Sequence, residues 1–556
     1  MDLKSGDTGS APVQATVTLT VSGPGTVVSS APASSCTATC SLSAAKGALV
    51  HLEARPDPGG SFTGWSGACT GTSGCDLTVE SAISIAATFA GAPPPPPPPS
   101  QHLLAVQVAG SGIVKSDPPG IECPGRCSRT FAEGTSVTLL ATPAAGFRFD
   151  GFGGACAGPA CSLKLGADAR VAASFALLPP HRVVVHVAGD GGGKVASDPP
   201  GIDCPGTCAA EFVEGTRVTL SARPGALSKL SLSLGACSTM PCALDLVSDA
   251  DVLAVFQLRR YVLVDLGEPQ RFSVGGSISP HGTFIVGSDA MVGPWLRASG
   301  TFIDLGLAVG GSFVGGVNDA GMVAGTHGVT AVRWQDGVVI ELGTLGGESS
   351  AIGINNAGII VGYSNRADGT QRAVSWTFNR PTDLGSLPGQ TMSIAAAIND
   401  TGLIVGSSWN VPYRPRAVAF RSPGRIEDLG TLGGPLSAAL GVSDPGVIVG
   451  YSMTGAGDVH GFFRAGPQMI DVGVVPGMFG SQLFSVNSAG MAVGYSWNST
   501  DGVGIAYGEG RLVNLNDLID NAPGIVGLGR SVDENGRIVG EAIIDGWDHA
   551  ILLEPH

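Results

Sequence analysis

The sequence predicts an all-β protein in which three small disulfide-bonded modules in tandem precede a C-terminal seven-bladed β-propeller. Three observations support this fold class. All 12 cysteines precede residue 243 and fall into three groups of four. A hairpin phrase whose Asx turn ends in glycine recurs seven times in the rest of the chain. The 85 glycines, 38 prolines and only 13% charged residues are typical of turn-rich β structure.

The repeats and the composition between them divide the chain into six segments. We expect a disordered N-terminus (1–15), module 1 (16–90), a polyproline linker (91–101), module 2 (102–177), module 3 (178–258) and the propeller (259–556). The small polar residues of the N-terminus lack the apolar content that folding requires. The proline run at 93–99 predicts a stiff polyproline II spacer of roughly 20 Å, at about 3.1 Å per residue.

Each module has the same order of short β segments. An alternating opening strand, such as residues 17–21, leads through a glycine-rich turn to a Cys-x3-Cys segment. A Val-x-Leu strand, a Pro/Gly turn, an aromatic stretch with Gly-Ala-Cys and a closing Ala-x-Phe strand follow. Alternation over strand lengths without a helical period indicates β structure. Because about 75 residues bury little apolar surface, we expect covalent crosslinks in each module.

We predict that the cysteines pair locally within each module. The expected disulfides are Cys36–Cys40, Cys69–Cys75, Cys123–Cys127, Cys156–Cys161, Cys204–Cys208 and Cys237–Cys242. Each disulfide that closes such a short loop contributes only about 2 kcal/mol. Pairing a cysteine of the first segment with one of the second segment would close longer loops and gain somewhat more, so this energy does not decide between the two pairings. A zinc site is the less favoured alternative, because these spacings are loose for zinc. An even cysteine count in repeated positions is typical of an oxidising compartment.

Three sequence features of the modules carry a family resemblance. They are the Gly-Trp-Ser-Gly-Ala-Cys phrase that contains Trp65 and ends at Cys69, the Val-x-Leu-x-Ala-x-Pro strand and the closing Ala-x-Phe. With them, residues 16–257 resemble the divergent internalin-type B-repeat, a bacterial extracellular domain, in three copies. This resemblance implies a β-grasp-like fold. Module 3 departs from the pattern, because Ser233 stands where Trp65 and Phe152 stand in the other copies. We therefore expect module 3 either to be looser or to pack against the propeller.

The C-terminal region repeats one hairpin, best seen in residues 353–364. Its turn glycines are Gly282, Gly321, Gly358, Gly402, Gly446, Gly490 and Gly536. Seven copies spaced by 37 to 46 residues, with four short strands each, predict a propeller. The region opens with a strand of the fourth type (261–267) and ends with one of the third type (549–553). We expect these two strands to pair and close the ring, because an open sheet leaves exposed edges.

Further phrases of this region resemble the HAF-type probable extracellular repeat family. They are Asp-Leu-Gly-Thr-Leu-Gly-Gly at 428–434, Ile-Asn-Asn-Ala-Gly at 354–358, and Leu-Asn-Asp-Leu at 515–518 followed by His-Ala-Ile-Leu-Leu at 549–553. The resemblance covers roughly residues 260–556. It implies an exported bacterial β-propeller, and it brings no defined activity to carry over to particular residues.

Composition and motifs exclude several function classes. A net charge of −15 and a pI near 5.0 argue against nucleic acid as a partner. No apolar run approaches the ~18 residues of a membrane span. The nine histidines are scattered, and Gly-x-Ser-x-Gly is missing, so we expect no metal, no cofactor and no α/β-hydrolase site. The first residues contain no apolar signal region, so we expect either a cytosolic chain or an export signal outside it; the cysteines favour export.

One face of the ring gathers the candidate ligand residues. If the strand before the Asx turn is innermost, the loops between second and third strands share a face with the loops that join successive sheets. The candidates on that face are Glu348, Arg366, Asp368, Gln390, Trp409, Tyr413 and Trp497. The alternative is that these are solvated loops in which a tryptophan or two packs locally.

These features together predict an exported, monomeric, cell-surface or secreted binding or adhesion-type protein. A repeat stalk presents the propeller, which binds a glycan or a protein. One alternative is a carbohydrate-active hydrolase or lyase, which needs two carboxylates, such as Glu348 and Asp368, about 5–10 Å apart. A second alternative is a structural spacer or assembly subunit without a small ligand.

Overall fold

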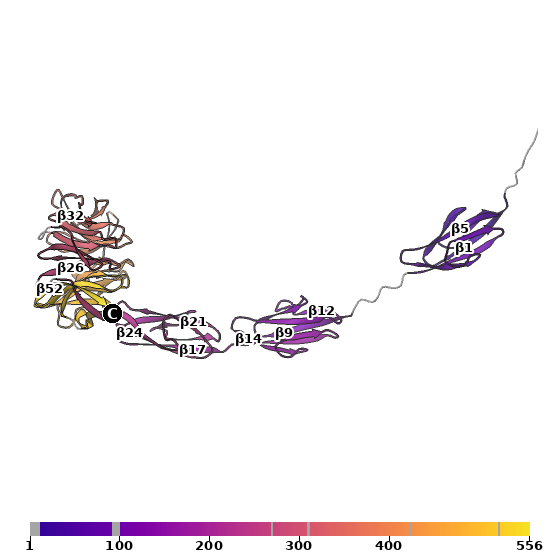
Figure 1. The fold of residues 1–556 in the computed structure, drawn as a ribbon, viewed down its shortest axis with the longest axis horizontal. Coiled ribbons are helices and arrows are strands. Elements are labelled where there is room, and N and C mark those ends of the chain that lie inside the picture. Colours follow the sequence, from indigo (N-terminus) through magenta and orange to yellow (C-terminus); the bar gives the residue numbers. More distant parts are fainter. Residues whose placement is uncertain (1–11, 92–99, 268–270, 308–311, 423, 521–522) are drawn as a thin grey trace, which may run out of the picture. The chain divides into compact units, whose positions relative to one another are not determined.

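The computed structural model describes residues 12–91, 100–267, 271–307, 312–422, 424–520 and 523–556. The proline run at 93–99 and most of the predicted disordered N-terminus lie outside the described residues. The chain divides into two compact units, 1–176 and 177–556, and each is described by itself (Figure 1).

Module 1 is a sandwich of two four-stranded sheets. One sheet has the order β4 (Cys40–Ala45), β1 (Gln14–Ser22), β8 (Ile83–Ala90), β6 (Ser61–Gly67), and the other β3 (Ala33–Cys36), β2 (Gly25–Ser30), β5 (Ala48–Pro56), β7 (Cys75–Val79). Strands β1 and β8 pair in parallel, so the first and last strands of the module lie side by side. Val17 and Ile85 from one sheet share a single apolar core with Val27 and Leu52 from the other. Alternate residues of each strand therefore face this core.

Modules 2 and 3 repeat this topology. In module 2 the sheets are β12 (Ser128–Ala132), β9 (Gln101–Ala109), β16 (Ala169–Leu177), β14 (Phe147–Gly154) and β11 (Glu122–Cys123), β10 (Gly112–Asp117), β13 (Ser136–Pro143), β15 (Cys161–Lys164). In module 3 they are β20 (Ala209–Val213), β17 (Pro180–Ala188), β24 (Ala250–Leu258), β22 (Ser228–Gly235) and β19 (Asp203–Cys204), β18 (Gly193–Asp198), β21 (Arg217–Pro224), β23 (Cys242–Asp245).

The expectation of a β-grasp-like module is wrong. A β-grasp packs a helix on one sheet, whereas the described parts of all three modules contain two facing sheets and no helix. Strands of two to nine residues alternate between exposed and buried positions, and the connections between them are only a few residues long. Each sheet therefore buries one face, and a second sheet covers it.

Disulfides join the two sheets of each module where the chain passes from one to the other. Cys36 ends β3 in one sheet, and its bond to Cys40 leads directly into β4 of the facing sheet. Cys69 and Cys75 close the connection from β6 to β7 in the same way. The equivalent bonds are Cys123–Cys127, Cys156–Cys161, Cys204–Cys208 and Cys237–Cys242. Local crosslinks thus fix two of the six crossings between the sheets of each module.

The described residues after Arg260 form seven four-stranded sheets. The first six, from inner to outer strand, are β26 (Ser273–Ile278), β27 (Phe284–Asp289), β28 (Gly293–Ala298), β29 (Thr301–Asp304); β30 (Ser312–Val317), β31 (Val323–His327), β32 (Thr330–Gln335), β33 (Val338–Glu341); β34 (Gly346–Ile354), β35 (Ile360–Arg366), β36 (Gln371–Thr377), β37 (Arg380–Gly385); β38 (Met392–Ile398), β39 (Ile404–Trp409), β40 (Arg416–Ser422), β41 (Arg425–Asp428); β42 (Gly433–Val442), β43 (Ile448–Thr454), β44 (Val459–Arg464), β45 (Ile470–Asp471); and β46 (Gly480–Val486), β47 (Ala492–Trp497), β48 (Gly502–Gly508), β49 (Arg511–Asn514). A 3-10 helix, η1 (Leu515–Leu518), follows β49.

The seventh sheet combines both ends of this region. It contains β50 (Gly524–Val532), β51 (Ile538–Ile544), β52 (Trp547–Pro555) and the N-terminal strand β25 (Tyr261–Asp265). Strand β25 pairs antiparallel with β52, from Tyr261 opposite Pro555 to Asp265 opposite Ile551, so the expected pairing is confirmed. The first strand of each sheet contacts the first strand of the next, and β50 contacts β26. The sheets therefore succeed one another in a propeller-like ring.

A set of buried Asx side chains connects neighbouring sheets at the turns between first and second strands. The Nδ2 atoms of Asn318, Asn355, Asn399 and Asn487 donate to the backbone oxygens of Asn355, Asn399, Ser443 and Asp533, at 3.1, 3.1, 2.8 and 2.9 Å. The side-chain oxygen of each asparagine also accepts a backbone N–H within its own turn, as from Leu403 to Asn399 at 2.8 Å. Each asparagine thus fixes its own turn and ties it to the next sheet.

Module 3 packs against the propeller-like region. Its residues Ala226, Leu227 and Leu258 belong to one apolar cluster with Tyr261, Met491 and Val513. The backbone N–H of Leu227 donates to Glu509 Oε1 at 3.2 Å, and Arg511 Nη1 donates to the backbone oxygen of Asp190 at 2.8 Å. Glu509 lies in the turn between β48 and β49. The contact expected between module 3 and the propeller is therefore present.

Ser233 of module 3 stands where modules 1 and 2 have the aromatic residues Trp65 and Phe152, and it makes a different local contact. In module 1, Trp65 packs against Phe62 with ring centroids 5.0 Å apart. Ser233 is also buried, and its hydroxyl donates to the backbone oxygen of Cys237 at 3.0 Å. Module 3 thus replaces an aromatic contact by a hydrogen bond at this position.

Candidate functional site

The seven-sheet ring has two faces with different connections. We call the face with the turns between first and second strands the Asx face; it also holds the turns between third and fourth strands. The opposite face, the loop face, holds the connections between second and third strands and those between successive sheets. Because Glu509 lies in a third-to-fourth turn, module 3 contacts the Asx face.

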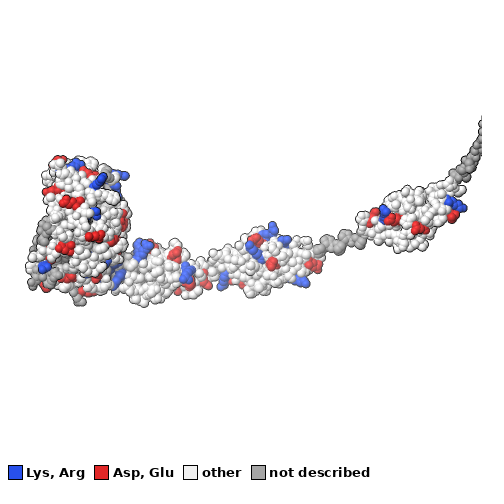
Figure 2. Space-filling model, turned by 45° about the horizontal axis from the view of Figure 1, so that its top comes forward, with Lys and Arg blue, Asp and Glu red and all other residues white. Residues whose placement is uncertain are grey.

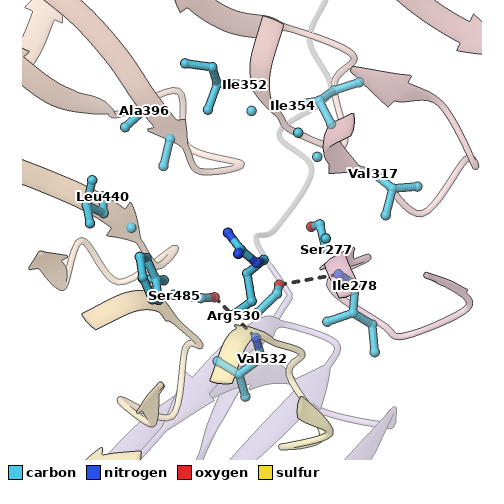
Figure 3. A pocket seen from close by; sticks show the side chains of 18 of the residues that line it. Ser277, Ile278, Val317, Ile352, Ile354, Ala396, Leu440, Ser485, Arg530 and Val532 are labelled. Carbon is cyan, nitrogen blue, oxygen red and sulfur yellow. Dashed lines mark hydrogen bonds between the residues drawn. The ribbon is translucent and has the colours of Figure 1, made fainter. Parts of the chain in front are cut away.

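A cavity of about 550 Å³ lies between the first strands of the seven sheets (Figure 3). All seven first strands contribute to its lining. The walls are mostly small and aliphatic, and the carboxylates of Asp400, Asp444 and Glu534 lie where the Asx turns border it. A cavity of this size suits a ligand of small-molecule dimensions.

Every first strand contains a β-bulge at the same level, and the bulged residue lines the cavity. These residues are Gly276, Gly315, Ile352, Ala396, Leu440, Phe484 and Arg530. A Cβ on Gly315 would lie only 2.2 Å from the backbone oxygen of Ile352, so close packing requires glycine there. Among these seven described positions, Arg530 is the only charged residue. The hairpin repeats did not indicate these positions, because a bulge depends on the pairing register.

Arg530 lies between an aromatic ring and a carboxylate. Its guanidinium carbon is 5.8 Å from the centroid of Phe484, and its Nη2 atom lies 3.0 Å from Glu541 Oε1. The Arg530 side chain is 38% exposed. Two hydroxyls lie beside it: Ser485 Oγ accepts from the N–H of Val532 at 3.3 Å, and Ser531 Oγ accepts from the N–H of Ile278 at 3.4 Å (Figure 3).

The candidates predicted from the sequence lie in three different sheets and their loops. Trp409 ends β39 and is only 8% exposed. Tyr413, in the following loop, is 59% exposed, and its ring packs edge-on against the ring of Trp409 with the centroids 5.3 Å apart. Trp497 ends β47 and stacks on Tyr495 at 4.7 Å. Both tryptophans thus pack locally, and of these three candidates Tyr413 presents the most surface.

The polar candidates mainly stabilise loops. Arg366 forms an ion pair with Asp383, which lies on β37, the outermost strand of the same sheet. Asp368 accepts from the N–H of Thr370 at 2.8 Å, and hydrogen bonds from the Thr370 side chain and backbone lower the pKa of the carboxyl. Glu348 is exposed on β34, and Gln390 is half-buried. The structure brings together Trp409 with Tyr413 and Arg366 with Asp368.

Sequence reasoning missed a set of exposed apolar side chains on the loop face. They are Phe272, Met291, Val292, Phe313, Val329, Val411, Phe479, Ile525, Ile543 and Trp547, each at least 45% exposed. All lie in loops or at the strand ends of this face. In the sequence, these residues could have been found as apolar residues inside connections that are rich in Gly, Pro or Asp. Figure 2 shows a surface that is mostly uncharged, with acidic and basic side chains scattered over it.

The described residues contain no group of three or more His, Cys, Asp or Glu side chains arranged to hold a metal ion. No helix within the described ranges is long and apolar enough to cross a membrane.

Comparison with known proteins gives one family match. The model of the divergent InlB B-repeat domain matches residues 9–93 and 116–178, which cover module 1 and most of module 2. The B-repeat resemblance inferred from the sequence is thereby confirmed for these two modules. No curated protein matches the chain.

Several solved structures show a distant likeness. TolB from Acinetobacter baumannii is 10% identical, with a TM-score of 0.30, over 52% of this chain and 65% of that protein. The gluconolactonase XC5397 from Xanthomonas campestris is 13% identical, with a TM-score of 0.29, over 54% and 95%. The pilus adhesin SpaC from Lactobacillus rhamnosus GG is 9% identical, with a TM-score of 0.18, over 44% and 43%. This chain thus spans less than two thirds of TolB.

Proposed function

We propose that this chain is an exported bacterial protein, secreted or held at the cell surface, that binds a partner through its propeller. In this proposal, residues 16–90, 102–177 and 178–258 are three B-repeat modules that form a stalk, joined in part by the linker 91–101. Residues 259–556 are a seven-bladed propeller of the HAF-repeat type. The repeated disulfides support an oxidising compartment outside the cytoplasm.

One observation carries the binding role: ten exposed apolar side chains lie on the loop face, whereas module 3 contacts the Asx face, on which Phe378 is the most exposed apolar residue. Soluble proteins rarely expose contiguous apolar surface unless it meets a partner. The loop face is free of module 3 within the described residues, and Val411, at 77% exposure, and Phe479, at 66%, are among its most exposed side chains. Module 3 therefore leaves the loop face available for recognition.

The chemistry of this face favours a protein as the partner. Met291, Val329, Val411 and Ile525 are aliphatic or thioether side chains, which pack well against another protein's apolar residues. Tyr413 and Trp547 are exposed aromatics, which stack on sugar rings and favour a glycan as the second candidate.

Binding of the full chain to a panel of extracellular-matrix proteins and to a glycan array tests this proposal. We expect the double variant Val411→Ser/Tyr413→Ala to lose at least tenfold in affinity for any protein or glycan that the natural chain captures. Val338→Ser, on the outer strand β33 and 56% exposed, is the matched control and should leave binding unchanged. Equal binding by the double variant and the control would contradict a loop-face site.

A further inference from the structure

We propose that the central cavity binds a small amphiphilic carboxylate, whose acid group is held by Arg530 and whose apolar body fills the space between the first strands. This inference goes beyond the proposed loop-face role, because it concerns a different surface and a different class of ligand. Either proposal can therefore fail while the other stands.

The position of Arg530 is the first argument. At the bulge level, six of the seven sheets carry glycine, alanine, isoleucine, leucine or phenylalanine, and all six maintain the same strand pairing. The fold thus accepts neutral residues at this point. A bulge redirects a side chain away from the regular alternation, and here it places the guanidinium of Arg530 at the wall of the cavity (Figure 3).

The hydrogen-bonding capacity of Arg530 is the second argument. A guanidinium offers five N–H donors in a fixed fork, which matches a carboxylate in a two-point contact. Glu541 takes one point of contact, at Nη2, and the ring of Phe484 lies against the group. The pair is only partly exposed, where a charge-assisted hydrogen bond is stronger than in open water. A ligand carboxylate would share the guanidinium with Glu541 and compete with it.

The two sides of the cavity differ in polarity, which is the third argument. The seam between β46, β50 and β26 contributes Arg530 and the hydroxyls of Ser277, Ser485 and Ser531. Across the cavity, Ile352, Ala396 and Leu440 present hydrocarbon (Figure 3). A ligand that satisfies both sides carries one anionic end and an aliphatic or aromatic body.

The charges around the cavity also indicate its route of entry. Asp400, Asp444 and Glu534 border the cavity at the Asx face and repel an anion there. Toward the loop face, the lining residues are Ser288, Ser312 and Phe313, which are neutral. An anionic ligand therefore enters from the loop face.

Isothermal titration calorimetry of the full chain tests the proposal with octanoate and 4-phenylbutyrate, each compared with its neutral amide. We expect at least one acid to bind and its amide to bind at least tenfold more weakly. Arg530→Leu should weaken acid binding at least tenfold. Arg425→Leu, which removes an exposed arginine on β41, should leave binding unchanged.

Glu541→Gln gives a change in the opposite direction. It removes the competing carboxylate, so the acid should bind several-fold more tightly, which a purely structural Arg530–Glu541 pair does not predict. If Arg530→Leu fails to fold, this variant decides alone. The proposal is overturned if neither acid binds at 10 mM, if the amide binds equally, or if Glu541→Gln brings no gain.

Discussion

The chain of amide contacts between turns is interrupted at Ser279, Ser443 and Asp533, and the interruption at Ser443 gives a stability prediction that can be worked out from the structure. Asn399 donates from Nδ2 to the backbone oxygen of Ser443 at 2.8 Å, whereas Ser443 has no amide with which to reach Asn487. Both side-chain oxygens accept an N–H within their own turns, from Leu403 and from Val447. Serine at this position therefore keeps the turn but not the contact to the next sheet.

Two exchanges test this reading in opposite directions. Asn399→Ser removes one hydrogen bond at a position that is 5% exposed, which costs about 0.5–1.5 kcal/mol, because the Ser443 oxygen keeps its second partner, the N–H of Gly446. Ser443→Asn supplies the missing donor toward Asn487 and should add about 1 kcal/mol. For a domain of this size, 1 kcal/mol changes Tm by about 2–4 °C.

Differential scanning calorimetry of the propeller transition, with disulfides intact, measures both shifts. Ser499→Asn makes the same exchange at an exposed position in a second-to-third loop and should leave Tm unchanged. The reasoning is refuted if Asn399→Ser leaves Tm unaltered, or if Ser443→Asn lowers it.

Three further outcomes are expected. Non-reducing peptide mapping should recover only local disulfides, and a peptide that links Cys36 to Cys69 would sink this scheme. Leu227→Ala removes a side chain that is only 2% exposed from the apolar cluster between module 3 and the propeller. Such a truncation costs about 2–5 kcal/mol in a protein core. Calorimetry of this variant should therefore resolve separate transitions for module 3 and the propeller. The hydrogen bond with Asp319 raises the pKa of His281 above its usual 6.5. The stability that this pair contributes is therefore complete below about pH 6.5, and it is lost as the pH rises through the pKa of His281 in the folded protein. Tm should therefore fall from pH 6 to pH 8.5, and His281→Gln should reduce that fall; an equal fall in both proteins would refute the assignment.

The candidate site was less predictable than the fold. Trp409 and Trp497 were plausible ligand residues because they end strands beside long loops, but their burial depends on neighbours such as Tyr413 and Tyr495. The sequence did not indicate Arg530, because an arginine at one position of a strand does not reveal which way its side chain points. Its direction follows from a bulge, and the bulge is visible only once β50 and β51 are paired.

The amino-acid sequence by itself determined the repeats, the strand types, the complementary first and last strands and the local position of the cysteines. These are short-range properties, set by turn residues, alternation and spacing. Only the tertiary structure decided that the modules are two facing sheets, that module 3 rests on the Asx face, and that one arginine enters the central cavity. Register, burial and docking depend on partners distant in the chain, and the local pattern of a strand is the same whichever partner it meets.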